Sequence, residues 1–506
     1  MRFRGLFTVR RRKGWFLMRR SGVLCHITSL PSEGGIGTLG KEAYRFVDYL
    51  VSAGMKVWQV LPIGPVGYGE SPYQSGSTFA GNPMLIDLPT LVDQGLMDAG
   101  DIPVLPSSSV CDFEPVKAAK DKALRAAFAY GFEKVSRQVK DHVRRTPWLQ
   151  DYALYAALKT EFELRSWMTW PDNIRLRKKS AVRAYTQRLK DEIDYQCFLQ
   201  YLFDMQWRAL REYANSHGIS LFGDIPIYVA EDSADAWTHP ECFQFDEDEH
   251  PLRVAGVPPD YFSADGQLWG NPLYNWQHMQ STKFDWWIER LQGAAARYDL
   301  LRIDHFIGFA NYYSIPFGAP NARKGKWVRS PGKSLFRQVR ARLPQLDIIA
   351  EDLGEVGPRV RELLDWCGFP GMKVLQFAFS GGDTNQHLPA YYTENAVVYT
   401  GTHDNDTTRG FWTKATEEEK EAAHAVMGEF EDEEAVSMFI RTAMASKPDL
   451  AMVPAQDLLD LGTEARMNYP GILGGNWQWR MTAEQMTALE ENAPELRTLL
   501  EGCERA

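Results

Sequence analysis

Short runs of apolar residues that end in polar residues recur along the chain, and stretches with helical spacing separate them. Eight runs are candidate strands: 22–30, 57–61, 221–229, 301–306, 348–352, 373–379, 397–404 and 452–457. Alternating strands and helices form a parallel sheet, and eight repeats predict an α/β fold, a (β/α)8 TIM barrel. An open doubly wound sheet is the alternative, but no Gly-x-Gly-x-x-Gly follows the first run.

Two gaps between the runs are too long for a single crossover helix. They predict long insertions at about 84–215 and 230–300, and we expect both at the C-terminal rim of the barrel, where loops build the site. A single catalytic domain then spans 18–506. Residues 1–17 hold six basic residues and no acidic one, which predicts a disordered tail, a start codon placed too early with Met18 as the true start, or a targeting peptide poor in serine.

Composition and charge exclude several classes of protein. The 506 residues are 44% hydrophobic and carry a net charge of −10, which excludes a mainly disordered chain and argues against nucleic-acid binding. No run of about 18 apolar residues occurs, so no membrane span is predicted. The six cysteines are scattered without a Cys-x-x-Cys pair, so we expect reduced thiols, a cytoplasmic protein and no metal site.

Acidic residues stand at the ends of several runs. Arg302 and Asp304 are two residues apart and point to the same face of a strand, where Arg302 would keep Asp304 ionised. Glu351 and Asp404 end two later runs, and Asp224 lies inside the third. Each acid alone could be a buried ion pair or a helix cap. Three acids at the C-terminal ends of three barrel strands instead favour acid/base catalysis.

Aromatic residues in polar segments indicate a carbohydrate ligand. The chain has 16 Trp and 21 Tyr, and flat apolar rings beside polar groups suit a sugar ring. Rings expected in such loops are those of Tyr73, Tyr261, Trp269, Tyr274, Trp276, Trp477 and Trp479. The segment 266–272 is too polar and glycine-rich for a core element, so we expect a loop there. Trp286, Trp287 and Trp366 have helical spacing and are expected to pack in the core.

Ten stretches, in order, carry a resemblance to a known family. They are SGVLCHITSLPS (21–32), WQVLPIGP (58–65), SPYQSGSTFAGNP (71–83), GDIPIYVAEDSADAW (223–237), GVPPDYFSADGQLWGNPLYNW (256–276), LRIDHFIGF (301–309), AEDLG (350–354), GFPGMKVLQFAF (368–379), GTHDND (401–406), and RMNYPG (466–471) with NWQWR (476–480). The chain resembles the amylomaltases, or 4-α-glucanotransferases, relatives of the α-amylase superfamily. Cys25 and Tyr469 depart from the expected pattern.

The resemblance implies a role for each matching site residue. Asp304 would be the nucleophile, Glu351 the general acid/base and Asp404 the stabiliser of the transition state. A retaining mechanism then requires the first two carboxyls about 5–5.5 Å apart. The substrate-binding residues implied are Tyr73, Asp224, Trp269, Gly270, Asn271, Arg302, His403 and Asn476.

The implied reaction is the transfer of 4-α-glucan segments between maltodextrins, without cofactor or metal. Maltooligosaccharides and α-1,4-glucans would be donors, and glucose or maltodextrin would be the acceptor. In the family, a loop like 256–276 arches over the cleft, which would exclude water and favour a sugar acceptor. Two alternatives stay open: an α-glucan hydrolase of the same fold, and a catalytically dead glycan-binding protein.

Overall fold

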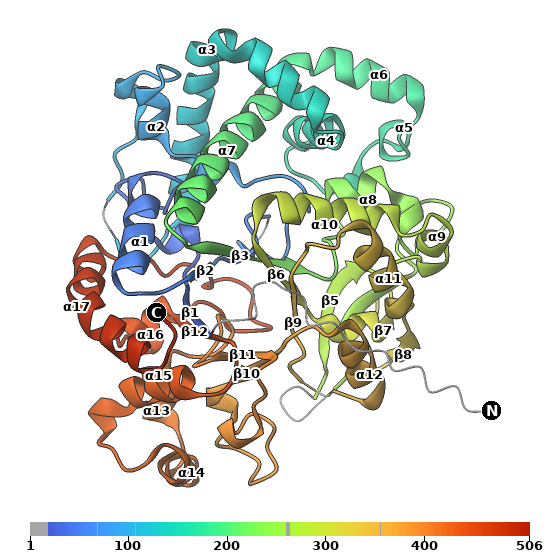
Figure 1. Ribbon diagram of the computed structural model, residues 1–506. Coiled ribbons are helices and arrows are strands. Elements are labelled where there is room, and N and C mark those ends of the chain that lie inside the picture. Colours follow the sequence, from blue (N-terminus) through green and yellow to red (C-terminus); the bar gives the residue numbers. More distant parts are fainter. Residues whose placement is uncertain (1–18, 68, 107, 260–263, 355) are drawn as a thin grey trace.

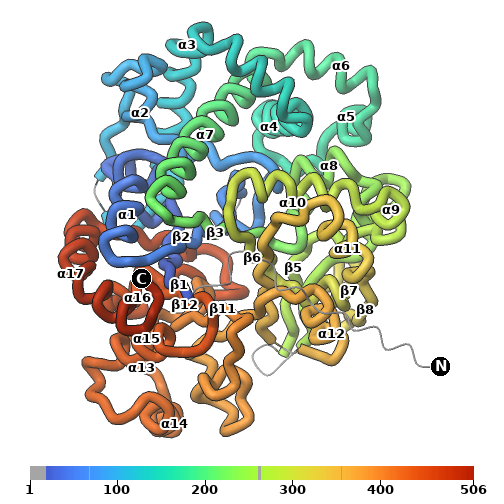
Figure 2. Tube along the Cα trace, viewed as in Figure 1, coloured from blue at the N-terminus to red at the C-terminus, as the bar shows by residue number. Residues whose placement is uncertain are grey.

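The structure is a computed structural model that describes residues 19–506 except residues 68, 107, 260–263 and 355. The predicted basic tail, residues 1–17, lies outside the described residues, as does Tyr261. Figure 1 shows a central barrel with helices around it, and Figure 2 traces the same path of the chain.

Eight parallel strands form the barrel. They are β1 (Arg20–Leu24), β2 (Val57–Gln59), β3 (Ser220–Pro226), β6 (Leu300–Asp304), β9 (Ile348–Ala350), β10 (Gly371–Val374), β11 (Ala396–Tyr399) and β12 (Leu450–Pro454). Their order is β10-β11-β12-β1-β2-β3-β6-β9. Between β9 and β10, Ala350 N donates to Pro370 O at 2.9 Å and Met372 N donates to Asp352 Oδ1 at 2.7 Å. The predicted (β/α)8 barrel is confirmed, and each predicted run contributes one strand.

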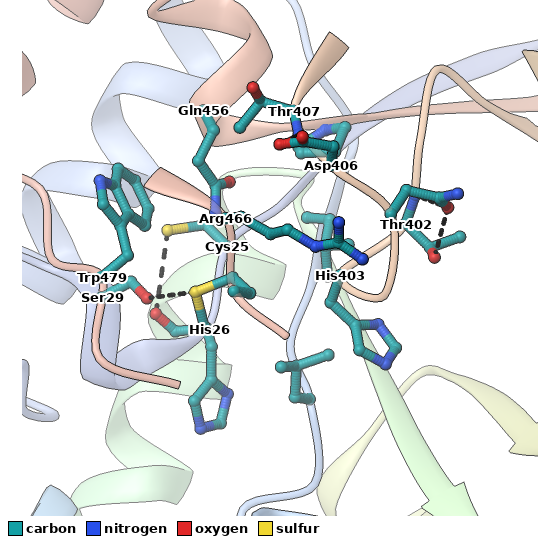
Figure 3. A pocket seen from close by; sticks show the side chains of 15 residues that line it. Cys25, His26, Ser29, Thr402, His403, Asp406, Thr407, Gln456, Arg466 and Trp479 are labelled. Carbon is teal, nitrogen blue, oxygen red and sulfur yellow. Dashed lines mark hydrogen bonds between the residues drawn. The ribbon is translucent and has the colours of Figure 1, made fainter. Parts of the chain in front are cut away.

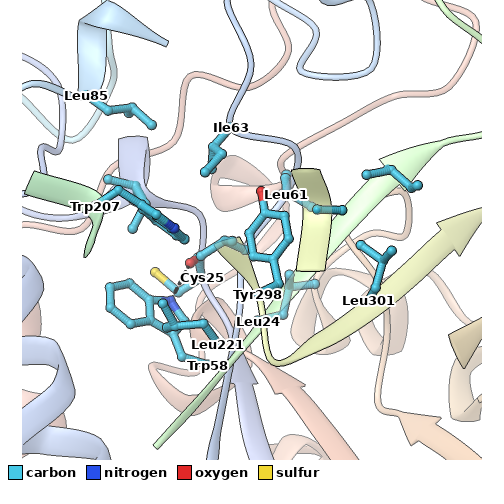
Figure 4. Close-up of a cluster of buried hydrophobic side chains, with 14 of the residues drawn as sticks. Leu24, Cys25, Trp58, Leu61, Ile63, Leu85, Trp207, Leu221, Tyr298 and Leu301 are labelled. Atoms are coloured by element: carbon cyan, nitrogen blue, oxygen red, sulfur yellow. Dashed lines mark hydrogen bonds between the residues drawn. The ribbon is translucent and has the colours of Figure 1, made fainter. Parts of the chain in front are cut away.

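The alternation of side chains along β6 explains how the barrel presents its polar groups. Leu301 and Ile303 are fully buried and pack outward against the surrounding helices, whereas Leu300 joins the core inside the barrel. Figure 4 shows the outer core, where Trp58 of β2 and Tyr298 lie among leucines of β1, β3 and β6. Because successive side chains alternate between faces, Arg302 is turned to the inside.

Helices precede and follow the strands. Between β1 and β3 lie α1 (Lys41–Ser52), α2 (Leu88–Asp93), α3 (Phe113–Arg145), α4 (Leu149–Glu161), α5 (Asp172–Arg175), α6 (Lys179–Arg188) and α7 (Lys190–Ser216). After β3 come α8 (Ala234–Thr238), α9 (Trp276–Ser281), α10 (Asp285–Arg297), α11 (Gly332–Arg342), α12 (Pro358–Cys367), α13 (Thr408–Lys414), α14 (Glu417–Met427), α15 (Ala435–Ala445), α16 (Ala455–Leu458) and α17 (Ala483–Gly502). In Figure 1, α3 to α6 form a layer at the top, and α7 returns from it to β3. Within the described residues, no helix has both the length and the apolarity to cross a membrane. The predicted division into one catalytic domain with two insertions stays a prediction.

A second, antiparallel sheet was not predicted. It has the order β5-β4-β7-β8 and consists of β4 (Arg253–Val257), β5 (Gln267–Pro272), β7 (Asn311–Pro316) and β8 (Lys326–Arg329). The prediction of a loop at 266–272 is therefore wrong. β5 is an edge strand, where glycine and polar side chains are tolerated because only one side of the backbone must pair. Its register with β4 shifts between Val254 and Gly256.

Candidate active site

Arg302 is the centre of a buried charge cluster at the C-terminal end of the barrel. β3 and β6 are neighbours, and their register places Asp224 opposite Arg302. Arg302 Nη1 donates to Asp224 Oδ2, and Arg302 Nη2 donates to Asp304 Oδ1 at 2.7 Å. The side chains of Arg302 and Asp224 are 4% and 0% exposed, whereas that of Asp304 is 29% exposed. One guanidinium thus holds two carboxylates, and only Asp304 is open to a ligand.

The cluster keeps Arg302 charged. Burial alone would lower the pKa of Arg302, but the carboxylates of Asp224 and Asp304 outweigh it and raise that pKa well above its ordinary value. Burial raises the pKa of Asp224, and the charge of Arg302 opposes this shift. A fork that binds two carboxylates at fixed angles also fixes the direction of the Asp304 side chain.

Glu351 follows β9 and lies beside Asp304. Its carboxyl is buried, with Oε1 accepting from Leu353 N at 2.6 Å and Oε2 accepting from His305 N at 2.7 Å. Burial, and secondly the negative charge of Asp304, raise the pKa of Glu351 to about 8, while Arg302 and the two backbone donors oppose the shift. At neutral pH this carboxyl therefore carries a proton that it can donate.

His305 is a site residue that the sequence analysis missed. It has a φ of 50°, a left-handed conformation that is uncommon for a large side chain, and its N–H donates to Glu351 Oε2. Its ring meets the edge of Trp269, with centroids 4.9 Å apart and an angle of 88° between the planes. Its Nε2 is buried and has no hydrogen-bond partner among the described residues.

Asp404 follows β11, and its side chain and its backbone carbonyl are both bound by neighbouring residues. Its Oδ1 accepts from Asn468 Nδ2 at 2.6 Å and lies 3.5 Å from His403 Nε2. Its backbone carbonyl accepts from Arg466 Nη2 at 2.7 Å. The Asp404 side chain is 45% exposed, so its second oxygen is available to a ligand. Asn468 and Arg466 lie in the motif 466–471, but the sequence analysis assigned neither of them a role.

The packed rings of Tyr73, His403 and Trp477 lie between Asp224 and Asp404. Tyr73 OH donates to Asp224 Oδ2 at 2.7 Å, and the Tyr73 ring stacks on His403 with centroids 5.2 Å apart and planes 14° apart. The centroid of the Trp477 ring lies 5.9 Å from the centroids of the Tyr73 and His403 rings. Burial raises the pKa of Tyr73 well above its ordinary value, so the phenol stays a neutral donor. The structure therefore brings the predicted Tyr73, Asp224 and His403 together.

Three other predicted residues lie on segments around this centre. Gly270 has a φ of 80°, which favours glycine, and Trp269 Nε1 donates to Gln267 Oε1 at 3.0 Å. The Asn271 amide is buried and donates to Val229 O at 2.8 Å, which joins β5 to the segment after β3.

Asn476 is also buried, and its amide closes the loop before it. Its Oδ1 accepts from Tyr469 N at 3.0 Å, and its Nδ2 donates to Ile472 O at 2.8 Å. The amides of Asn271 and Asn476 therefore brace the backbone around the site.

The exposure of several aromatic rings was predicted wrongly. Tyr274 is fully buried, and Trp477 and Trp479 are buried as well. The amide of Asn476, next to Trp477, bonds to the backbone, so a polar neighbour in the sequence did not indicate an exposed ring. Trp286 and Trp287 are buried, as predicted.

An open pocket of about 430 Å³ lies beside His403 (Figure 3). Its lining includes His26 at the end of β1, Thr402, Arg466 and Trp479. Burial, and then the neighbouring His403, lower the pKa of His26 to about 3, so the ring is neutral. The sequence analysis missed His26, because nothing in its local pattern marks it as facing a pocket.

Known proteins share this architecture. Residues 25–487 match the family model described as 4-alpha-glucanotransferase. The chain is 45% identical over 501 residues to the 4-alpha-glucanotransferase of Thermus thermophilus, covering 97% of this chain and 99% of the relative. It is 44% identical over 498 residues to that of Streptococcus pneumoniae serotype 4, covering 95% and 97%. The amylomaltase of Streptococcus agalactiae, solved in complex with acarbose, superposes with a TM-score of 0.94 at 41% identity, covering 96% of this chain and 100% of that one.

The barrel and these relatives define a glycosyltransferase of the retaining glycoside hydrolase type. The chain belongs to the 4-α-glucanotransferase family, and the predicted function is confirmed at that level.

Proposed function

We propose that Asp304, Glu351 and Asp404 catalyse a double displacement on α-1,4-glucans. Asp304, oriented by Arg302, attacks the anomeric carbon of the donor. Glu351 gives its proton to the leaving 4-oxygen, the glycosidic bond breaks, and a glycosyl ester forms on Asp304. The observation that carries the proposal is the buried Glu351 carboxyl, whose pKa is raised to about 8 by burial and by the partly exposed Asp304.

The same pair accounts for the second half of the reaction. The negative charge of Asp304 contributes to the raised pKa of Glu351, and this charge disappears when Asp304 becomes an ester. The pKa of Glu351 then falls, so the Glu351 carboxylate left by the first step is stable until an acceptor arrives. It accepts the proton of the acceptor hydroxyl, which attacks the anomeric carbon and releases Asp304.

Asp404 stabilises the positive charge that develops on the sugar ring. Its open oxygen, together with His403, binds ring hydroxyls in bonds that strengthen as the ring flattens. The Tyr73 ring stacks on His403 and fixes its plane, and the Tyr73 hydroxyl binds Asp224. One tyrosine therefore positions both His403 and Asp224.

We propose that glucose or a maltodextrin, rather than water, is the preferred acceptor, and that maltooligosaccharides and longer α-1,4-glucans are donors. Trp269 on β5 reaches the ring of His305, the residue after Asp304. This contact places a large apolar ring beside the residue that follows the nucleophile, and such a ring disfavours water near it.

We also propose that the enzyme acts in the cytoplasm and that its catalysis needs no cofactor or metal. All six cysteines are free thiols, five of them buried, which is typical of a reducing compartment. Every proposed proton and covalent transfer uses a carboxyl group of the chain itself.

Product analysis with maltotriose tests the proposal. The intact enzyme should produce glucose together with oligosaccharides longer than maltotriose. Asp304→Asn, Glu351→Gln and Asp404→Asn should each lose this ladder by about a thousandfold or more, since each removes a group that acts in the transition state. Glu418→Gln, at an exposed position of α14, is the matched control and should keep it. Full activity in any of the three site variants would overturn the assigned role.

A further inference from the structure

A group of three different metal-binding side chains lies outside the active site. Glu241 and Cys242 belong to the short turn Pro240–Cys242 after α8, and His278 belongs to α9. A carboxylate oxygen, the thiol sulfur and an imidazole nitrogen of these residues all lie within 4.8 Å of one another. Among the described residues, no other group of His, Cys, Asp and Glu meets this criterion.

The two segments that carry these groups are joined by their backbones. Asn275 N donates to Cys242 O at 2.8 Å, and Phe243 pairs with Tyr274 in an antiparallel bridge. Asn275 Oδ1 accepts from His278 N at 3.1 Å and caps α9. The positions of Cys242 and His278 are therefore set by hydrogen bonds that need no ion.

His239 lies beside this group. Its Nδ1 is 3.4 Å from Glu241 Oε1, at the start of the same turn. The Cys242 thiol is buried, so water has little access to its sulfur.

We propose that Glu241, Cys242 and His278 bind one borderline transition-metal ion, for which Zn²⁺ is the best fit. Sulfur, nitrogen and oxygen donors together are typical of zinc, whereas Ca²⁺ and Mg²⁺ prefer oxygen alone. On binding, the Cys242 thiol releases its proton to solvent and the sulfur bonds to the ion, so no oxidant or reductant is needed.

The ion has a structural consequence. It ties the turn after α8 to α9, and α9 follows directly on β5, which carries Trp269. Because an ion bound only by the folded chain stabilises it, zinc should raise the melting temperature of the whole enzyme. None of these three residues belongs to the catalytic machinery, so maltotriose transfer should continue in variants that lack the site.

Cobalt titration of the full-length, reduced, chelator-stripped enzyme tests this proposal. Co²⁺ should bind with a stoichiometry of one per chain and give a thiolate-to-cobalt charge-transfer band together with visible ligand-field bands. Cys242→Ser should abolish the charge-transfer band, and His278→Gln should weaken binding by about tenfold or more. Cys503→Ser and His217→Gln are the controls. Cys503 is partly exposed and directly follows α17, and His217 is exposed and directly follows α7, so both variants should bind Co²⁺ like the original enzyme.

The outcomes separate cleanly, with retained maltotriose transfer showing that each variant is folded. The proposal is supported if the charge-transfer band is lost in Cys242→Ser but not in Cys503→Ser. It also requires that zinc raise the melting temperature only of proteins in which the site is intact. Absence of the band in the original enzyme, or its persistence in Cys242→Ser, overturns it. If Cys242→Ser does not fold, the affinities of His278→Gln and His217→Gln for Co²⁺ are compared instead. Weaker binding in His278→Gln alone supports the proposal, and equal binding overturns it.

Discussion

The backbone N–H of His305 donates to Glu351 Oε2 at 2.7 Å, so one peptide unit links the residue after Asp304 to the carboxyl that must deliver the proton. His305 itself has a left-handed φ of 50°. The hydrogen bond fixes the acid relative to the nucleophile without using a side chain of His305. The two carboxyls that act in turn on one glycosidic bond therefore share a rigid frame.

The pH dependence of catalysis should follow Glu351. Since burial and the charge of Asp304 raise its pKa to about 8, the general acid loses its proton as pH rises through that value. We expect kcat/KM for maltotriose to fall about tenfold per pH unit well above pH 8. A donor with a leaving group that needs no protonation, such as glucosyl fluoride, should lack this alkaline decline in the glycosylation step. An identical decline for both donors would contradict the assignment.

The same shift affects stability. A carboxyl whose folded pKa lies above its unfolded value of 4.5 stabilises the fold below that value, and the contribution is lost as pH rises toward about 8. Glu351→Gln cannot ionise, so its melting temperature should fall less between about pH 5 and pH 8 than that of the original enzyme. Calorimetry of both proteins measures this difference, and parallel pH profiles would show that Glu351 ionises normally.

Arg302→Lys should damage catalysis far more than folding. Lysine keeps the charge but has a single nitrogen, so it lacks the rigid fork whose two nitrogens bind Asp224 and Asp304 separately. We expect the rate of glycosylation to fall by about a hundredfold, or ~2.7 kcal/mol, with a much smaller loss in the free energy of unfolding. Stopped-flow measurement of the first turnover and denaturant unfolding provide the two values. A near-normal rate would reduce Arg302 to a structural ion pair.

Asn468→Ala should weaken the role of Asp404. The variant removes the donor 2.6 Å from Asp404 Oδ1, so the carboxylate gains rotational freedom at a partly exposed position. We expect kcat to fall about tenfold with little change in KM, because the loss, ~1.4 kcal/mol, affects the transition state. Asn395→Ala, at an exposed position, is the control. An increase in KM with unchanged kcat would instead assign Asn468 to ground-state binding.

Trp269→Ala should shift the balance from transfer to hydrolysis. The ring covers His305 beside the nucleophile, and its loss should admit water to the glycosyl ester. We expect the ratio of hydrolysis to transfer to rise about threefold to tenfold, in line with ~0.5–1.5 kcal/mol for an aromatic pair. The ratio is measured from glucose and longer oligosaccharides at fixed maltotriose. An equal loss of both products would mean that Trp269 only supports β5.

The barrel was predictable because its strands are buried on both faces and therefore appear as near-continuous apolar runs. The positions of Asp304, Glu351 and Asp404 at the C-terminal ends of barrel strands were predictable, because these acids interrupt or end such runs. The antiparallel sheet was missed, since β5 is an edge strand whose glycine and polar residues pair through the backbone. His305, Asn468 and His26 were missed for another reason: their roles arise from contacts between distant segments or from a left-handed backbone, neither of which leaves a local pattern.

Trapping of the covalent intermediate tests the central claim most directly. Glu351→Gln, incubated with α-glucosyl fluoride, should form the ester without an acid but lack the base that resolves it. Peptide mass spectrometry should then find one glucosyl group on the peptide that contains Asp304, and adding Asp304→Asn should remove it. Labelling at another residue, or no label on a protein that is folded and binds maltodextrin, would contradict the proposed double displacement.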